Sequence, residues 1–245
     1  ERNFKSIYYK TSLNSAISDN FLDYPNRSTF TSYSQMVEFV GLNIYNTTEQ
    51  LFVFSEFLVD IFCNLAEKFT EEESEFIQII FDNIKRFLEL SNHELITLDN
   101  GNKIIVEKNV YASEASQIVS ETSIEEAIKV LEYNHFSNKG NIQRKKEILI
   151  ALANYLEPFR RELNYSEELK DIMKVNNQKV IAFEKLFEMY NNFGLRHNNS
   201  NQYHLDLADD ELEQWYDDIY TSTLFVILSM DESRILSKLK TLREG

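Results

Sequence analysis

A short polar segment between two amphipathic stretches holds the residue types best suited to chemistry. Arg196, His197 and His204 lie close together there, and Asn198 and Asn199 add amide donors and acceptors. An arginine can neutralise the charge that grows on a phosphate during cleavage, and a histidine exchanges protons near neutral pH. Because a ribose 2′-hydroxyl would supply the nucleophile, this set predicts phosphodiester cleavage with no metal ion and no other cofactor. The alternative, which composition alone favours, is a polar connector whose arginine pairs with a carboxylate.

The remaining candidate residues indicate no second site. The sequence contains no phosphate-binding glycine loop, zinc-protease helix motif, nucleophile elbow or calcium loop. His93 and His135 have no second ligand type at a fixed spacing, so we expect both to make local contacts only. Cys63 is the single cysteine, which excludes an intrachain disulfide and a cysteine-based zinc site, and its apolar neighbours favour a buried thiol.

The charge and the compartment restrict the function further. A net charge of −15, from 40 acidic and 25 basic residues, argues against a protein that coats nucleic acid over its whole surface. A ribonuclease remains compatible with it, since a few cations near the scissile phosphate are enough. The lone cysteine fits a reducing compartment, and we find neither an export signal nor a membrane span. These features predict a cytoplasmic protein.

The composition predicts a mostly α fold. Only two prolines and five glycines occur in 245 residues, which favours long helices over a loop-rich β-sandwich. Apolar residues recur at helical spacing, and Pro158 interrupts one of these patterns. Three helices are expected at about residues 43–68, 70–90 and 180–193. Further helices are expected to begin near residues 123, 142, 166 and 206–210. Asp231 is expected to cap a short terminal helix.

One strong β pattern interrupts the helices. Residues 94–98 and 103–107 flank Asn100-Gly101, a pair that supplies the positive φ angles of a tight turn. We therefore expect a small β-hairpin at about residues 94–107, lying across the helices. The whole chain then reads as an N-terminal arm or short helices over residues 1–40 and a multi-helix bundle over residues 41–245.

The polar segment also carries a resemblance to a known family. The string Asn-Asn-Phe-Gly-Leu-Arg-His-Asn-Asn, residues 191–199, precedes a helix with Trp215-Tyr216 and Tyr220. It resembles the C-terminal region of bacterial abortive-infection proteins of the AbiJ kind, within the HEPN superfamily. Residues 151–157, Ala-Leu-Ala-Asn-Tyr-Leu-Glu, are similar to the part that precedes this region in those proteins. The HEPN-like region would cover about residues 142–245.

The resemblance implies a HEPN-like helical bundle, usually a homodimer, in which Arg and His of both subunits cleave RNA without metal in antiphage defence. Arg196 would stabilise the phosphate, His204 would act as acid or base, and His197, Asn198 or Asn199 would position the substrate or the catalytic groups. Seven residues separate Arg196 from His204, one more than the family motif has. An altered motif is also how non-catalytic HEPN members arise.

Two other classes of function are compatible with the sequence. A non-catalytic interaction or regulatory module, such as a sensor, scaffold or dimerisation domain, would use the aromatic surface around Phe52 to Phe62 or the hairpin. The acidity of the chain favours a basic protein partner for it. Acidic mimicry of nucleic acid is the weaker alternative, because the acidic residues gather mostly at helix starts and on solvent faces.

Overall fold

The computed structural model confirms a mostly α, multi-helix fold and describes residues 18, 19, 21–23, 30–43, 47–65, 71–98, 101–196, 202, 203 and 207–244. The helices are η1 (Phe21–Asp23), α2 (Tyr33–Asn43), α3 (Thr48–Leu65), α4 (Glu71–Leu90), α5 (Val110–Ser120), α6 (Ile124–Glu132), η3 (Phe136–Asn138), α7 (Ile142–Leu156), η4 (Glu157–Phe159), α8 (Arg160–Tyr165), α9 (Glu167–Ile172), α10 (Ile181–Asn192) and α11 (Asp209–Glu244). The strands are β1 (His93–Thr97), β2 (Lys103–Glu107), β3 (Val175–Asn176) and β4 (Lys179–Val180). Among the described residues, no helix combines the length and the apolarity needed to cross a bilayer.

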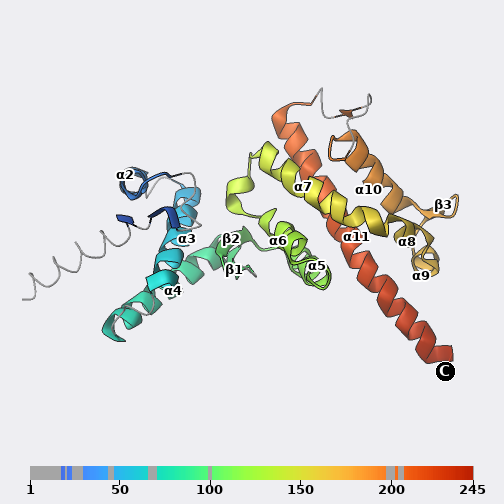
Figure 1. Ribbon diagram of the computed structural model, residues 1–245, viewed down its shortest axis with the longest axis horizontal. Coiled ribbons are helices and arrows are strands. Elements are labelled where there is room, and N and C mark those ends of the chain that lie inside the picture. The colour runs from blue at the N-terminus through green and yellow to red at the C-terminus, as the bar shows by residue number, and fades with distance from the viewer. Residues whose placement is uncertain are drawn as a thin grey trace, which may run out of the picture. The chain divides into compact units, whose positions relative to one another are not determined.

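The chain divides into two compact units, residues 1–108 and residues 109–245 (Figure 1). In the first unit, β1 and β2 form the expected antiparallel hairpin, with Leu95 opposite Ile105. Gly101 has a φ of +86°, which the turn requires. Glu56 of α3 is buried, and its carboxylate accepts a hydrogen bond from the backbone N–H of Ile105 at 2.5 Å. This bond fixes the hairpin to α3.

The expectation of a buried Cys63 was wrong. Cys63 is exposed on α3, although Ile61 nearby is only 4% exposed. Successive residues of an α-helix are rotated by about 100°, so positions two apart point in nearly opposite directions. An apolar neighbour in the sequence therefore does not imply a shared buried face.

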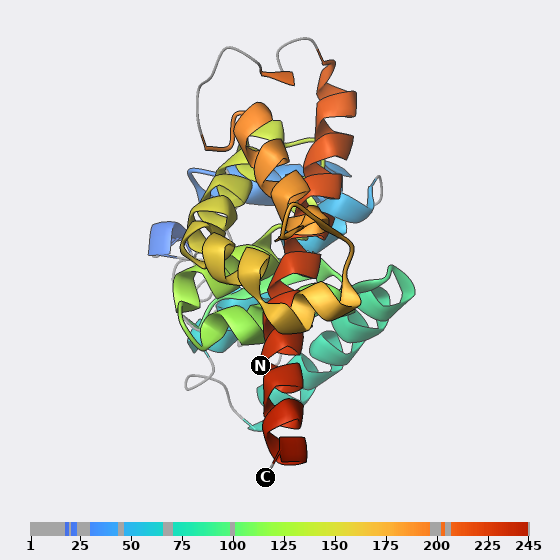
Figure 2. The same cartoon turned by 90° about the vertical axis from the view of Figure 1, so that its right-hand side faces the viewer.

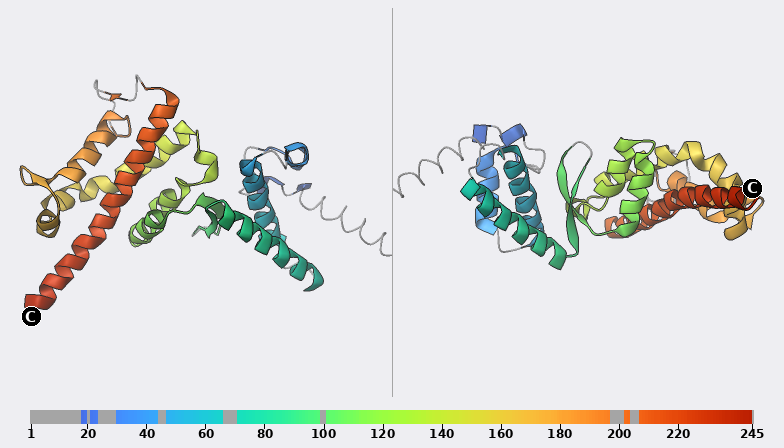
Figure 3. Two further views of the ribbon diagram at one scale, coloured as in Figure 1. Left: turned by 180° about the vertical axis from the view of Figure 1, so that it is seen from behind. Right: turned by 90° about the horizontal axis from the view of Figure 1, so that it is seen from below.

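The core of the second unit lies where α7 and α10 pack against α11 (Figures 2 and 3). The apolar spacing of α10 predicted its buried face, which Phe183, Leu186, Phe187 and Tyr190 form. The hydroxyls of Tyr190 and Thr223 lie 2.6 Å apart, which joins α10 to α11. Burial raises the pKa of Tyr190 above its ordinary value of 10.0, so the hydroxyl, which is protonated at neutral pH in any case, also resists ionisation at alkaline pH.

The final helix is longer than expected. α11 continues through Asp231 to Glu244, so a helix start at Asp231 was a wrong prediction. No glycine or proline interrupts this stretch of the sequence, and Asp231 pairs instead with Arg234 one turn later. Figure 2 shows the resulting long rod.

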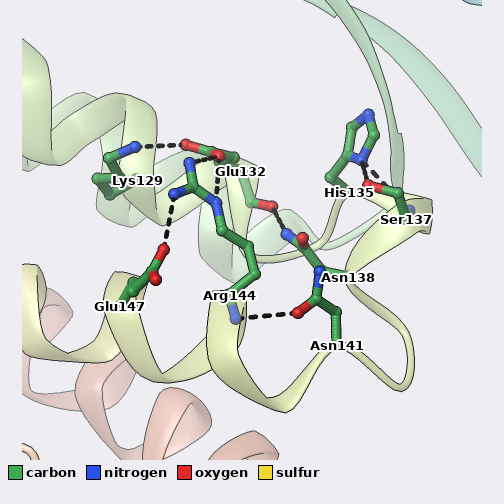
Figure 4. Close-up of polar contacts among 8 residues, drawn as sticks. All are labelled: Lys129, Glu132, His135, Ser137, Asn138, Asn141, Arg144 and Glu147. Atoms are coloured by element: carbon green, nitrogen blue, oxygen red, sulfur yellow. Dashed lines mark hydrogen bonds and ion pairs between the residues drawn. The ribbon is translucent and has the colours of Figure 1, made fainter. Parts of the chain in front are cut away.

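Polar contacts join α6 to α7 (Figure 4). The Glu132 carboxylate binds both Lys129 and Arg144, and the side chain of Asn141 caps α7 by accepting the backbone N–H of Arg144 at 3.1 Å. Burial by itself would raise the pKa of Glu132, but the bonds to Lys129 and Arg144 outweigh burial and lower it. The contact between α6 and α7 is thus held by charge as well as by apolar faces.

The predicted break at Pro158 is confirmed. α7 ends at Leu156, the 3-10 helix η4 contains Pro158, and α8 begins at Arg160. Ser166 then caps α9 as expected, by accepting the backbone N–H of Leu169 at 3.3 Å. The break leaves Glu157 at the end of α7, where it becomes important for the site.

A second, shorter hairpin lies before α10. β3 and β4 pair antiparallel across Asn177 and Gln178, whose φ angles are +50° and +67°. Two left-handed residues are typical of a type I′ turn, in which Asn followed by Gly is the preferred pair. Here glutamine occupies the position of the glycine, so the sequence pattern did not indicate a turn.

We expect Gln178→Gly to raise the free energy of unfolding by up to about 1 kcal/mol. The reason is that a left-handed conformation costs a residue with a Cβ roughly 1–2 kcal/mol, part of which the greater entropy of unfolded glycine offsets. Urea denaturation checks the value. Gln178→Ala is the matched control, because it shortens the side chain but keeps the Cβ, and it should give no gain. A loss of stability in Gln178→Gly would contradict the turn assignment.

Candidate functional site

The connector between α10 and α11, residues 193–208, begins with a helix end that depends on glycine. Gly194 has a φ of +68°, and the backbone N–H of Leu195 donates to the carbonyl of Tyr190 at 3.1 Å. This is the bond of a Schellman motif, in which a left-handed glycine lets the chain leave the helix. Leu195 is 1% exposed and anchors the turn in the core. Arg196 follows directly, at a position that the backbone fixes.

Arg196 forms an ion pair with Glu157. The Nη1 atom of Arg196 lies 2.9 Å from Oε2 of Glu157 and 3.4 Å from Oδ1 of Asn191. The Arg196 side chain is 12% exposed and that of Glu157 is 38% exposed. The alternative interpretation of the segment, a polar connector, predicted this pairing of the arginine with a carboxylate. A guanidinium has five N–H donors, so a single contact with a carboxylate does not use its whole binding capacity.

The other predicted site residues, His197, Asn198, Asn199 and His204, lie outside the described residues. The ends of the connector, however, are placed. Gln202 is buried, and its Nε2 atom donates to the carbonyl of Asn191 at 3.2 Å. Arg196 and Gln202 therefore both attach to the last turn of α10.

The two histidines that were expected to make local contacts do so. The Nδ1 atom of His93 lies 2.7 Å from the carbonyl oxygen of Ser91, and the ring packs against Phe52. The Nδ1 atom of His135 lies 2.6 Å from Oγ of Ser137 at the start of η3 (Figure 4). Both contacts fix a turn, which is a structural role.

Sequence reasoning missed an apolar groove beside the connector. Its walls come from the C-terminal half of α10, from the C-terminal part of the connector and from the first turns of α11. We call it the aromatic groove, and Met189, Phe193, Tyr203, Leu207 and Trp215 line it. Its volume is about 500 Å³, within the roughly 300–1,000 Å³ typical of ligand pockets. The aromatic residues around the connector were the available indication, but sequence distance did not show that they meet.

Fold and site together define a mostly helical protein with an arginine and an aromatic groove at the end of one helix. Comparison with protein-family models, with curated proteins and with solved structures gives no significant match.

Proposed function

We propose that the chain is a metal-independent ribonuclease of the HEPN type, a cytoplasmic effector of antiphage defence by abortive infection that acts as a homodimer. The observation that carries the proposal is the position of Arg196. A Schellman turn and an ion pair hold this arginine at the start of a connector that also contains His197 and His204. The resemblance to AbiJ-like proteins rests on the same connector.

In this proposal the roles follow from charge and proton affinity. Arg196 stabilises the negative charge on the phosphate, and His204 transfers the proton of the 2′-hydroxyl or of the leaving oxygen. His197, Asn198 and Asn199 position the phosphate. Glu157 orients the guanidinium in the absence of RNA, and a phosphate joins or replaces this carboxylate.

The test is RNA cleavage in excess EDTA by the wild type and by Arg196→Ala and His204→Ala. We expect each substitution to lower the rate by about 100-fold or more, because removal of a charge-stabilising donor or of a general acid typically has this effect. Arg161→Ala is the matched control: Arg161 is an exposed arginine of the same unit, near Pro158, and its loss should leave cleavage unchanged. Urea denaturation of each variant separates lost chemistry from lost folding.

Equal cleavage by the wild type and both variants would show that a contaminant or another site cuts the RNA. An absence of cleavage by the wild type, across single-stranded and structured RNA and with phage extract added, would also contradict the proposal.

The ion pair between Arg196 and Glu157 favours a second candidate, a non-catalytic interaction or regulatory module. Arg196 is 12% exposed and paired with a carboxylate, and these properties need no role for it beyond holding the connector in place. In that case Arg196→Ala and Glu157→Gln would lower stability similarly. A basic protein partner would co-purify with the wild type and with Arg196→Ala alike.

A further inference from the structure

Two large aromatic rings of the aromatic groove face water. Tyr203 is 52% exposed and Trp215 is 39% exposed, although aromatic rings gain more than most side chains from burial. Phe193, which is 3% exposed, supports both: its ring centroid lies 5.8 Å from that of Tyr203 and 5.1 Å from that of Trp215. The two exposed rings are thus held in place by one buried ring. They provide preformed flat surfaces on which a planar ligand can stack.

The rim of the groove is charged. Glu211 of α11 is exposed there, and Lys185 of α10 pairs with Glu188 at 2.5 Å. A carboxylate can accept two parallel hydrogen bonds from neighbouring N–H donors. Among the four RNA bases, guanine alone presents a ring N–H beside an amino group. An ammonium such as that of Lys185 binds a phosphate as a point charge.

The groove and the candidate site share the connector, because Tyr203 of the connector lines the groove. Phe193 lies three positions before Arg196 on the same turn, and Tyr203 follows Gln202, which is bonded to the same last turn of α10. A nucleotide with its base in the groove would therefore place its chain beside the connector.

We propose that the aromatic groove binds one nucleobase of single-stranded RNA, guanine before the others, between Tyr203 and Trp215, with Glu211 accepting from the base edge. Cleavage of the bound strand by the connector is a further step, and this step rests on the proposed function. Stacking on aromatic side chains is how many proteins hold single strands, and it needs no broad positive surface. It therefore suits a chain with a net charge of −15.

The single tryptophan of the sequence makes the groove directly observable, because Trp215 is one of its walls. The probes are five-residue oligodeoxynucleotides with a central G, A, C or T between thymines, which lack the 2′-hydroxyl and cannot be cleaved by the proposed reaction. We expect saturable quenching of Trp215 fluorescence by the full-length chain, strongest with G. Tyr203→Ala should weaken binding about fivefold or more, and Glu211→Gln should remove the preference for G.

Tyr165→Ala is the matched control, since Tyr165 is 51% exposed but lines a different groove of the same unit. It should leave quenching unchanged. The proposal is overturned if no oligonucleotide quenches Trp215, or if Tyr203→Ala and Tyr165→Ala behave alike. A fluorescence change that depends on protein concentration alone would overturn it too, since a second copy would then fill the groove.

The two proposals fail separately. Quenching that follows the expected pattern in a chain that never cleaves RNA supports the groove and contradicts the ribonuclease. Cleavage that Arg196→Ala abolishes but Tyr203→Ala leaves intact, with binding also intact, supports the ribonuclease and overturns the groove.

Discussion

Replacing Phe187 by alanine is expected to lower the free energy of unfolding of the second unit by about 3–5 kcal/mol. Phe187 is fully buried on α10. The ring of Tyr190 meets it edge-on at 5.7 Å, and the guanidinium of Arg160 lies 4.7 Å from its centre. Truncation would remove the transfer free energy of the ring and also leave a cavity that the surrounding helices fill only in part.

The measurement is urea denaturation followed by the fluorescence of Trp215, which lies in the second unit and so reports on that unit. Phe225→Ala is the matched control, because Phe225 of α11 is 47% exposed and should cost under about 1 kcal/mol. Similar losses in the two variants would mean that α10 does not contribute the core that its apolar spacing indicates.

The fold was largely predictable because it depends on local information. Three features each determine the structure of only a few neighbouring residues: the apolar spacing of α10, the glycine that ends it and the proline that separates α7 from α8. Asn100-Gly101 likewise predicted the first hairpin. The turn at Asn177 and Gln178 was missed because glutamine occupies the position that glycine holds in the usual Asn-Gly turn.

The candidate site was only partly predictable, for a physical reason. The sequence placed Arg196 after a helix end, which is a local property. Its ion pair with Glu157 and the contacts of Tyr203 and Trp215 with Phe193 depend on how α7, α10 and α11 pack. Nothing in the spacing of these residues encodes that packing, so the groove required the structure.

A buried cation, Lys145, lies between α7 and α11, and no spacing pattern in the sequence indicated its contacts. The Nζ atom of Lys145 lies 2.7 Å from Oε1 of Glu213 and 2.6 Å from Oδ1 of Asp217, and the Lys145 side chain is 8% exposed. The hydroxyl of Tyr133 donates to the same Asp217 oxygen at 2.9 Å. Burial, and then the nearby Asp217 charge, raise the pKa of Tyr133, which keeps this donor protonated.

We expect Lys145→Met to lower the free energy of unfolding by about 3 kcal/mol at neutral pH. Methionine keeps the apolar stem but removes the ammonium, so two carboxylates are left together without their cation. Breaking a buried ion pair by removing one partner typically costs roughly 3–5 kcal/mol, and the lower end applies because Glu213 and Asp217 are 21% and 49% exposed. Lys146→Met is the control, since it removes the same charge from the next position of the helix.

The dependence on pH separates charge from packing as the cause of this loss. Burial alone would raise the pKa of Glu213, but hydrogen bonds from Lys145 and from the N–H of Gly140 outweigh it and lower the pKa below its ordinary value of 4.5. A carboxylate with a lowered pKa stabilises the fold above its unfolded pKa, and this contribution disappears as the pH falls through the folded value. In Lys145→Met the cation that lowers this pKa is gone, so the wild type loses more stability on acidification than the variant does. The difference in unfolding free energy should therefore shrink as the pH falls from 7 to values below 4.5. A difference that stays constant would show that lost packing, and not lost charge pairing, destabilises the variant.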